Sequence, residues 1–79
     1  MYRLVERPVK VVVKDGVPFI VVDRDEQRKI SVVIDSWDEV GKWWEHDPEH
    51  HVFRVVMVDG AVLDLDHSAD EWMIYRVLD

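Results

Sequence analysis

The sequence predicts a mainly β domain, either a small antiparallel six-stranded barrel or a two-layer sheet. Two observations predict this class. Residues 9–35, laid without a gap over residues 53–79, match apolar with apolar at most inward-looking positions, and both copies carry Asp-Gly at the same place, Asp15-Gly16 and Asp59-Gly60. Each copy also shows the period of two that is typical of a half-buried strand. We therefore expect two three-stranded units, residues 9–35 and 53–79, joined by a short helical connection at 36–52 that contains tryptophans.

The first unit begins with a strand over residues 9–14, where Val alternates with Lys or Val. Asp15-Gly16 fits a two-residue turn with positive φ, so residues 17–22 fold back as the hairpin partner. Pro18 cannot donate a ladder hydrogen bond and places this strand at a sheet edge or a bulge. Residues 23–28 are polar and predict a loop, and residues 29–35 form the third strand.

The second unit repeats this order, with strands at 52–58, 61–66 and 72–78 and a turn near 67–70. Asp64 and Asp66 alternate with leucines, which predicts one buried face and one solvated face. Arg54 and Arg76 are single cations within apolar runs, and we expect them to pair across the sheet with Asp64 or Glu39. The residues with a predicted structural role are Asp15, Gly16, Asp59, Gly60, Arg54, Asp64 and Arg76.

The connection has no counterpart in either copy. Ser36 and Glu39 have the spacing of a capping box, which predicts a short helix that ends before Pro48. Three of the four tryptophans, at 37, 43 and 44, lie here. They either fill one end of the sheet or form an exposed aromatic surface. Neighbouring Trp43 and Trp44 cannot both point inward from an extended segment, so at least one of them is a surface residue.

Composition restricts the class of protein. The chain of 79 residues has the size of one small domain, and it contains no cysteine, which excludes disulfides and thiolate chemistry. The reducing cytoplasm is the expected compartment. The first residues lack the apolar core of a signal peptide, and no apolar run is long enough to span a bilayer, so no membrane partner is expected.

Charge is unevenly distributed along the chain, whose net charge is −7. Residues 1–35 carry seven Lys or Arg against six Asp or Glu, whereas residues 36–79 carry three against eleven. Nucleic-acid affinity depends on neutralising phosphates with cations, so nucleic acid is disfavoured as the sole partner. The oppositely charged halves could pair between chains, and a homodimer is expected.

No catalytic residue, cofactor or metal site is predicted. The histidine loop, residues 46–51, holds His46, His50 and His51, but Pro48 prevents the helical spacing that a zinc site uses. Asp23/Asp25 and Asp64/Asp66 are explained by a loop and by strand alternation. No serine lies in a Gly-x-Ser-x-Gly elbow and no Gly-rich phosphate loop is present. We therefore expect the protein not to be an enzyme.

The chain resembles a small bacterial family of uncharacterised single-domain proteins. The resemblance rests on residues in this order: Pro8-Val9, Asp15-Gly16, Pro18-Phe19, Trp37-Asp38-Glu39, Trp43-Trp44, Arg54-Val55, Asp64-Leu65, Trp72, and Arg76-Val77 through Asp79. Members often carry an aromatic residue and a Gly near the end of the second strand, whereas Val22-Asp23-Arg24 has neither. Members are often encoded near translesion DNA polymerase genes. This neighbourhood implies an accessory part in DNA damage tolerance, with a translesion polymerase component as partner.

Three functions follow as hypotheses. The leading one is a non-catalytic protein-binding module whose site residues are Trp43 and Trp44, rimmed by Asp38, Glu39 and Glu45. The first alternative is a single-stranded nucleic-acid binder that stacks bases on those tryptophans or on Tyr75. Its phosphate contacts would come from Lys10, Lys14, Arg24, Arg28 and Lys29, and it requires cations and aromatic residues to share a face. The second alternative is a small metal-dependent hydrolase that uses the histidine loop.

Overall fold

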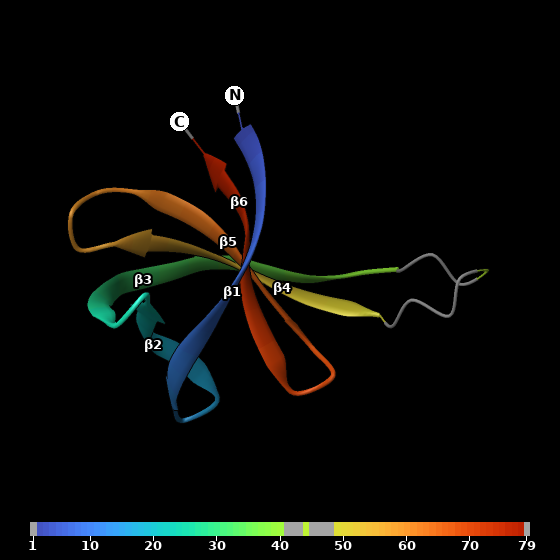
Figure 1. The fold of residues 1–79 in the computed structure, drawn as a ribbon, viewed down its shortest axis with the longest axis horizontal. Helices are drawn as coiled ribbons and strands as arrows, with labels where there is room; N and C mark the ends of the chain where they lie inside the picture. The colour runs from blue at the N-terminus through green and yellow to red at the C-terminus, as the bar shows by residue number, and fades with distance from the viewer. Residues whose placement is uncertain (1, 41–43, 45–48, 79) are drawn as a thin grey trace.

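The structure is a computed structural model that describes residues 2–40, 44 and 49–78. Its strands are β1 (Tyr2–Lys14), β2 (Val17–Asp23), β3 (Glu26–Glu39), β4 (His50–Met57), β5 (Val62–Ser68) and β6 (Glu71–Leu78). They form a closed antiparallel barrel in which the order around the barrel equals the order along the chain (Figure 1). The prediction of a barrel, left open against a two-layer sheet, is thereby settled. None of the described residues form a helix that could cross a membrane.

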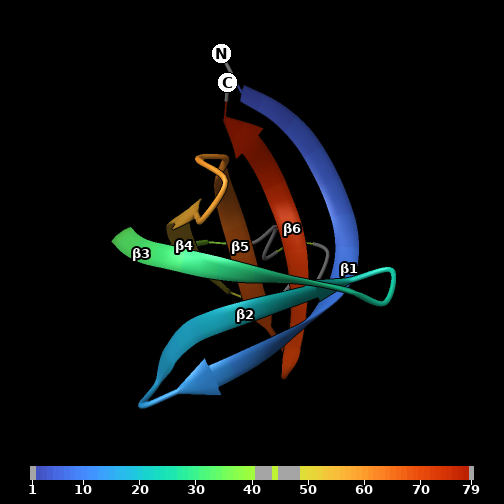
Figure 2. The ribbon, with the colours of Figure 1, turned by 90° about the vertical axis from the view of Figure 1, so that its left-hand side faces the viewer.

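The two long strands divide their length between two neighbours. Residues 2–9 of β1 pair with β6, and residues 10–14 pair with β2. In the same way residues 26–29 of β3 pair with β2, and residues 30–39 pair with β4. Figure 2 shows β1 as a long arc that leaves β6 and reaches β2. Arg7 Nη2 lies 2.5 Å from Asp23 Oδ2 and ties β1 to the end of β2 close to this change of partner.

The hydrophobic core occupies one face of every strand, as the period of two requires. It consists of Val21, Ile30, Val55, Met57, Leu63, Leu65 and Ile74. Partly buried residues complete it, among them Val9, Val11, Phe53 and Trp72. The core therefore draws on β2 to β6 directly and on β1 through half-buried valines. A domain of this size has little further apolar area to bury, so each of these side chains matters.

Three of the hairpins turn within two residues. The first turn is Asp15-Gly16, with φ of 53° and 77°, as the sequence predicts. Arg24 and Asp25, and then Ala69 and Asp70, also have positive φ at both central positions, the pattern of a type I′ turn. The prediction of a loop over residues 23–28 is wrong, because this tight turn lets β2 run to Asp23 and β3 begin at Glu26.

The second Asp-Gly pair forms a different turn from the first. Gly60 has a φ of 92° while Asp59 does not have a positive φ, and the Gly60 N–H donates to the Met57 carbonyl at 2.9 Å. Asp59 Oδ1 accepts a hydrogen bond from the Ala61 N–H. A Cβ on Gly60 would meet open space, so the demand for glycine comes from its φ.

Bulges bend the strands where the barrel closes. Between Val12 and Val13 the β1–β2 register shifts, and Phe19 is the extra residue beside Pro18. This confirms that Pro18 lies at an irregularity. A second shift between Leu4 and Arg7 leaves Glu6 with a φ of 52°. Such bulges increase the local twist and allow a six-stranded sheet to close.

The predicted helix at the start of the connection is wrong, because residues 36–39 belong to β3. Trp37 pairs with Val52, and Glu39 pairs with His50. The Glu39 carboxylate contacts Arg76 and not the Ser36 N–H, which instead donates to Asp35 Oδ1 at 2.8 Å. The capping-box spacing is therefore present in a strand, and the described residues contain no α-helix.

Ala69→Gly should stabilise the protein. Ala69 has a φ of 50° in its turn, where a Cβ costs about 1 to 2 kcal/mol that glycine does not incur. After the extra backbone entropy of glycine is subtracted, we expect a gain of about 0.5 to 1 kcal/mol in the free energy of unfolding. Urea unfolding followed by tryptophan fluorescence measures it.

Ala61→Gly is the matched control, because Ala61 does not have a positive φ and packs against the core. It should lower the free energy of unfolding. Equal effects of the two substitutions would contradict the assignment of strain to the β5–β6 turn.

Candidate functional site

A cluster of charged and aromatic side chains covers the face of β3 to β6 that lies opposite the core. This polar cluster consists of Trp37, Glu39, His50, Arg54, Asp64, Asp66, Tyr75 and Arg76. The strand register places four charges in one row across four strands, in the order Asp35, Arg54, Asp64, Arg76. Opposite charges are therefore direct neighbours throughout this row, which favours the pairing of these strands.

Asp64 is the centre of the polar cluster. Its side chain is 0% exposed, and it accepts two hydrogen bonds from Arg54, from Nε at 2.8 Å and from Nη2 at 3.0 Å. Arg76 approaches from the other side, with Nε 3.4 Å from Asp64 Oδ2. The hydrogen bond that Arg54 donates to the Asp64 carboxylate raises the pKa of Arg54. A carboxylate can be buried at this depth because a two-pronged guanidinium donates to both of its oxygens.

Asp66 is also buried, with 1% of its surface exposed. His50 Nδ1 lies 2.6 Å from Asp66 Oδ2, and the His50 ring stacks in parallel with the Tyr75 ring at a centroid distance of 6.3 Å. The Arg76 guanidinium lies 4.5 Å from the centroid of the Tyr75 ring. Burial raises the pKa of the Tyr75 phenol. The Tyr75 ring therefore orients His50, which contacts Asp66, and Arg76, which contacts Asp64.

Glu39 joins the end of β3 to β6. It contacts the Arg76 guanidinium and accepts a hydrogen bond from Trp37 Nε1 at 3.0 Å. Burial alone would raise the pKa of Glu39, but the hydrogen bonds from Trp37 and Arg76 outweigh it and lower the pKa. The Trp37 ring lies 5.0 Å below the Arg54 guanidinium, a cation–π contact. Trp37 therefore covers the ion pairs.

The prediction of a solvated face for Asp64 and Asp66 is wrong. Alternation correctly places them opposite Leu63 and Leu65, but the long side chains around them exclude water from this face. The prediction that Arg54 and Arg76 pair with Asp64 or Glu39 is confirmed, since Arg54 binds Asp64 and Arg76 contacts both Glu39 and Asp64. The polar cluster is thus a covered ionic network, and its geometry is that of a structural element.

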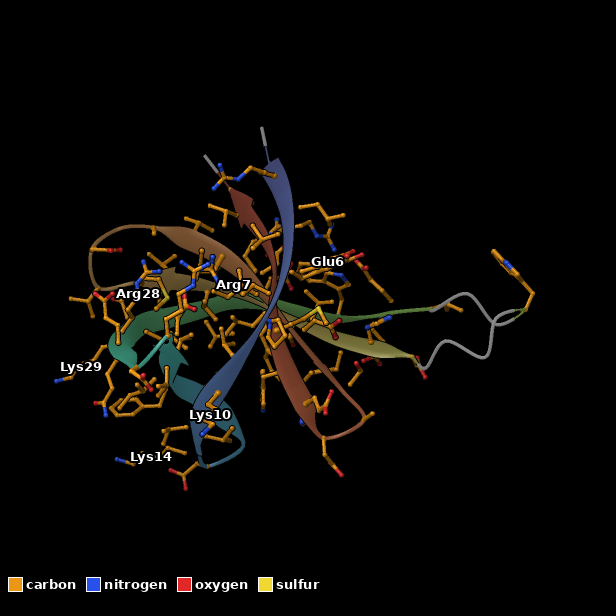
Figure 3. The ribbon with its side chains drawn as sticks, viewed as in Figure 1. Glu6, Arg7, Lys10, Lys14, Arg28 and Lys29 are labelled. Carbon is orange, nitrogen blue, oxygen red and sulfur yellow. The ribbon has the colours of Figure 1, made fainter. Side chains whose placement is uncertain are left out.

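A second surface lies on the outer side of the sheet formed by β1, β2 and β3. The register places Lys10 beside Val22, Val12 beside Ile20, and Ile20 beside Lys29, on the face opposite buried Val21. We call this surface the lysine face, with members Lys10, Val12, Lys14, Phe19, Ile20, Val22 and Lys29. Lys14 Nζ lies 5.8 Å from the centroid of the Phe19 ring. Lys10, Lys14 and Lys29 gather at one end of the molecule (Figure 3).

The lysine face combines charge with exposed apolar surface. Val12 and Phe19 are exposed, at 48% and 43%, and all three lysines are exposed. Within these described strands, no acidic residue takes part in the face. Beside Lys10 and Val22 opens a depression of about 860 Å³, whose other walls include the apolar Trp72 and Met73 and, outside the lysine face, Arg24 together with the acidic Asp25, Asp70 and Glu71. The arrangement can bind an anionic group next to an apolar one.

The remaining cations of the nucleic-acid hypothesis lie elsewhere. Arg28 is on the core side, opposite Val21, and its Nη2 lies 3.1 Å from Asp59 Oδ2. Arg24 stands in the β2–β3 turn, and Tyr75 belongs to the polar cluster. Of that predicted set the structure places Lys10, Lys14 and Lys29 on one face, with Arg24 at the edge of the depression beside Lys10, and it supplies Phe19 as their aromatic neighbour.

The predicted tryptophan surface is only partly described. Trp44 is 63% exposed, which confirms that at least one of the adjacent tryptophans lies on the surface. Trp43 and Glu45 lie outside the described residues. Of the predicted rim, Asp38 is exposed and contacts His51 Nδ1, whereas Glu39 belongs to the polar cluster. In Figure 1 the paired ends of β3 and β4 extend away from the β1–β2 hairpin, which carries most of the lysine face.

The described histidines all contact side chains of the sheet. His51 packs edge-on against Phe53, and the His67 ring stacks on Trp72 at a centroid distance of 4.2 Å. His46 lies outside the described residues. In the part of the chain that the structure describes, no three His, Asp or Glu side chains are grouped so that they could hold a metal ion.

Sequence reasoning missed the apolar members of the lysine face. The sequence pattern assigns Phe19 and Val12 only to strands, yet the alternation of Lys10, Val12 and Lys14 indicates the face. The residue between Lys10 and Lys14 on the same face of a strand is Val12, so a basic face with an apolar centre follows from the period of two. Phe19 could not be foreseen, because it is the bulged residue.

Arg54→Leu should destabilise the protein by about 2 kcal/mol or more. The substitution leaves the fully buried Asp64 carboxylate without its two closest donors, and an uncompensated buried charge costs this much. Urea unfolding followed by tryptophan fluorescence measures the loss. Arg28→Leu is the control: it removes the pair with exposed Asp59 and should cost much less. A larger loss for Arg28→Leu would contradict the central role of Asp64.

Glu39 should make the stability of the protein depend on acidity. Its pKa is lowered in the folded state, so its contribution to the free energy of unfolding is complete above the ordinary glutamate value of 4.5. The contribution is lost as the pH falls through the lower, folded-state value. Glu39→Gln should therefore flatten the fall in stability between roughly pH 5 and pH 3, measured by thermal unfolding. Glu71→Gln, at an exposed residue of β6, should leave the slope unchanged.

Comparison with known proteins places the chain in a family without assigning an activity. Residues 1–79 match the family described as a domain of unknown function, DUF6504, and the chain belongs to that family. No curated protein and no solved structure matches the chain.

Proposed function

We propose that this member of DUF6504 is a non-catalytic protein-binding module and that the lysine face is its binding surface. One observation carries the proposal: Lys10, Lys14 and Lys29 surround exposed Val12 and Phe19 on a chain whose net charge is −7. Exposed apolar side chains that lie together, rimmed by charge, are typical of interaction sites. Because these three lysines lie on one face, that surface is positively charged although the whole molecule is negatively charged.

The chemistry of the surface defines the partner. Three lysines with no acidic neighbour on the face favour a partner that carries carboxylates, since complementary potentials direct association. Val12, Phe19 and Ile20 favour a partner that also presents apolar side chains. The depression beside Lys10 and Val22 could receive one such side chain against Trp72. The partner is therefore an acidic segment with apolar residues at alternate positions.

The resemblance described above points to the first partners to test. Gene neighbourhood implies an accessory part in DNA damage tolerance, so translesion polymerase components are the proteins with which we expect the module to associate. This choice of partner rests on gene neighbourhood and not on the geometry of the surface. The surface around Trp43 and Trp44, with Asp38, Glu39 and Glu45, stays a prediction as a second contact.

Single-stranded nucleic acid is the second candidate ligand of the same face. It is favoured by three lysines within two neighbouring hairpins, which could neutralise phosphates. It is disfavoured by the aromatic content, because nonspecific single-strand binders stack successive bases on several rings. The described lysine face offers Phe19 alone, while Tyr75 lies in the polar cluster. The hydrolase hypothesis has no comparable support from the described residues.

Phe19→Ser should weaken binding of an acidic apolar peptide about tenfold, because it removes the aromatic anchor of the face. The probe is a fluorescently labelled peptide of alternating Glu and Leu, and anisotropy measures binding to the full chain. Val58→Ser, at an exposed apolar residue outside the lysine face, should leave the affinity unchanged. Equal affinities of Phe19→Ser and the unsubstituted chain would contradict the proposal.

A labelled single-stranded oligonucleotide serves as the second probe in the same titration. Binding of the peptide in preference to the oligonucleotide supports a protein partner. Saturable binding of the oligonucleotide alone, lost steeply as salt rises, would instead assign the face to nucleic acid. Purified translesion polymerase subunits then replace the peptide to test the proposed partner.

A further inference from the structure

The second half of β3 has a strand neighbour on one side only. Residues 30–39 pair with β4, whereas β2 pairs only with residues 26–29. On the side away from β4, no Cα atom of β1 lies within 8 Å of a Cα atom of β3 in the described strands. Figure 1 shows this half of β3 running outward beside β4 with no other strand alongside. It is a sheet edge within an otherwise closed barrel.

This edge exposes apolar side chains. Ile34 is 54% exposed and Val32 is 49% exposed, although both lie in the middle of a strand. Ser31, Asp35 and Ser36 are exposed as well, so the strand faces solvent over most of its free length. Natural sheets protect such edges with charged side chains, prolines, bulges or a covering segment, because an open edge pairs readily with another strand. The register of β3 with β4 shifts at Ser31 and at Ile34, so this edge carries bulges. Between Ile30 and Ile34 the free edge has no charged residue.

The charges at the two ends of β3 are opposite. Arg28 and Lys29 precede the apolar stretch, against Glu26 alone, and Asp35, Asp38 and Glu39 follow it, so the start of β3 is net basic and its end is acidic. Two copies of β3 placed side by side in antiparallel orientation therefore set the basic start of one strand beside the acidic end of the other. A parallel arrangement would set like charges together. We infer that two copies of this chain form a twofold-symmetric dimer by antiparallel pairing of their β3 edges.

The physical basis is strand addition between identical partners. Main-chain hydrogen bonds continue the sheet from one barrel into the next, and the exposed Val32 and Ile34 side chains meet near the twofold axis. Diagonal neighbours in a sheet are within reach of long side chains, so Lys29 of one chain can contact the acidic end of β3 in the partner subunit. This dimer does not depend on the proposed function, because it uses the free edge of β3, whereas the lysine face is the outer face of β1 and β2 with Lys29 as its one residue from β3.

Sedimentation equilibrium over a range of protein concentrations tests the dimer. The unsubstituted chain should sediment as a dimer that dissociates on dilution. Ile34→Lys places two like charges close to the axis and should raise the dissociation constant at least about tenfold. Val58→Lys is the matched control, since Val58 is 68% exposed and lies outside β3, and it should leave the dimer intact. A monomer at every concentration, or a dimer unaffected by Ile34→Lys, would overturn the inference.

A charge variant guards against an effect of Ile34→Lys on folding. Lys29→Glu changes the basic end of β3 and should weaken the dimer, whereas Lys10→Glu makes the same change of charge on β1 and should not. Lys10→Glu should also weaken binding of the acidic peptide, so failure of the proposed function and failure of the dimer give different results. Equal dimer dissociation constants for the two charge variants would overturn the antiparallel arrangement.

Discussion

The arrangement of β3 to β6 depends on a single buried carboxylate. Asp64 has no access to water and receives both of its hydrogen bonds from Arg54, with Arg76 on its other side. Because a buried charge requires its partners, it fixes where β4 and β6 stand relative to β5. Arg76 in turn holds Glu39, at the far end of β3. One ionic network therefore reaches all four strands from β3 to β6, on the face opposite the hydrophobic core.

The second constraint is geometric, and it produces both proposed surfaces. Six strands close into a barrel here because β1 and β3 change partners part of the way along. The short β2 lies between residues 10–14 of β1 and residues 26–29 of β3, and together they form the three-stranded sheet that carries the lysine face. The same shortness of β2 leaves the far half of β3 without a neighbour. The lysine face and the free edge of β3 thus both result from the difference in length between β2 and its neighbours β1 and β3.

Much of the fold could be predicted from the sequence, because the signals are local. Alternating valines and the first Asp-Gly pair mark the strands and the first hairpin. The helix predicted at Ser36 failed, since strand pairing of Trp37 with Val52 outweighed a local capping pattern. Of the polar cluster, only the ion pairs of Arg54 and Arg76 with Asp64 or Glu39 could be predicted. Alternation tells which residues share a face, but whether that face is covered depends on Trp37 and Arg76, which lie far from Asp64 in the chain.

The first and last strands of the barrel pair with each other. Tyr2 is the ladder partner of Leu78, and every strand neighbours the strands that precede and follow it in the chain (Figure 1). The described ends of the chain are held together in the same way as the two sides of any hairpin. Joining them by a short linker and opening the chain at Gly60 would keep all six strand pairings. The order of the strands is circular, and the fold specifies a ring of neighbours in place of a first and a last element.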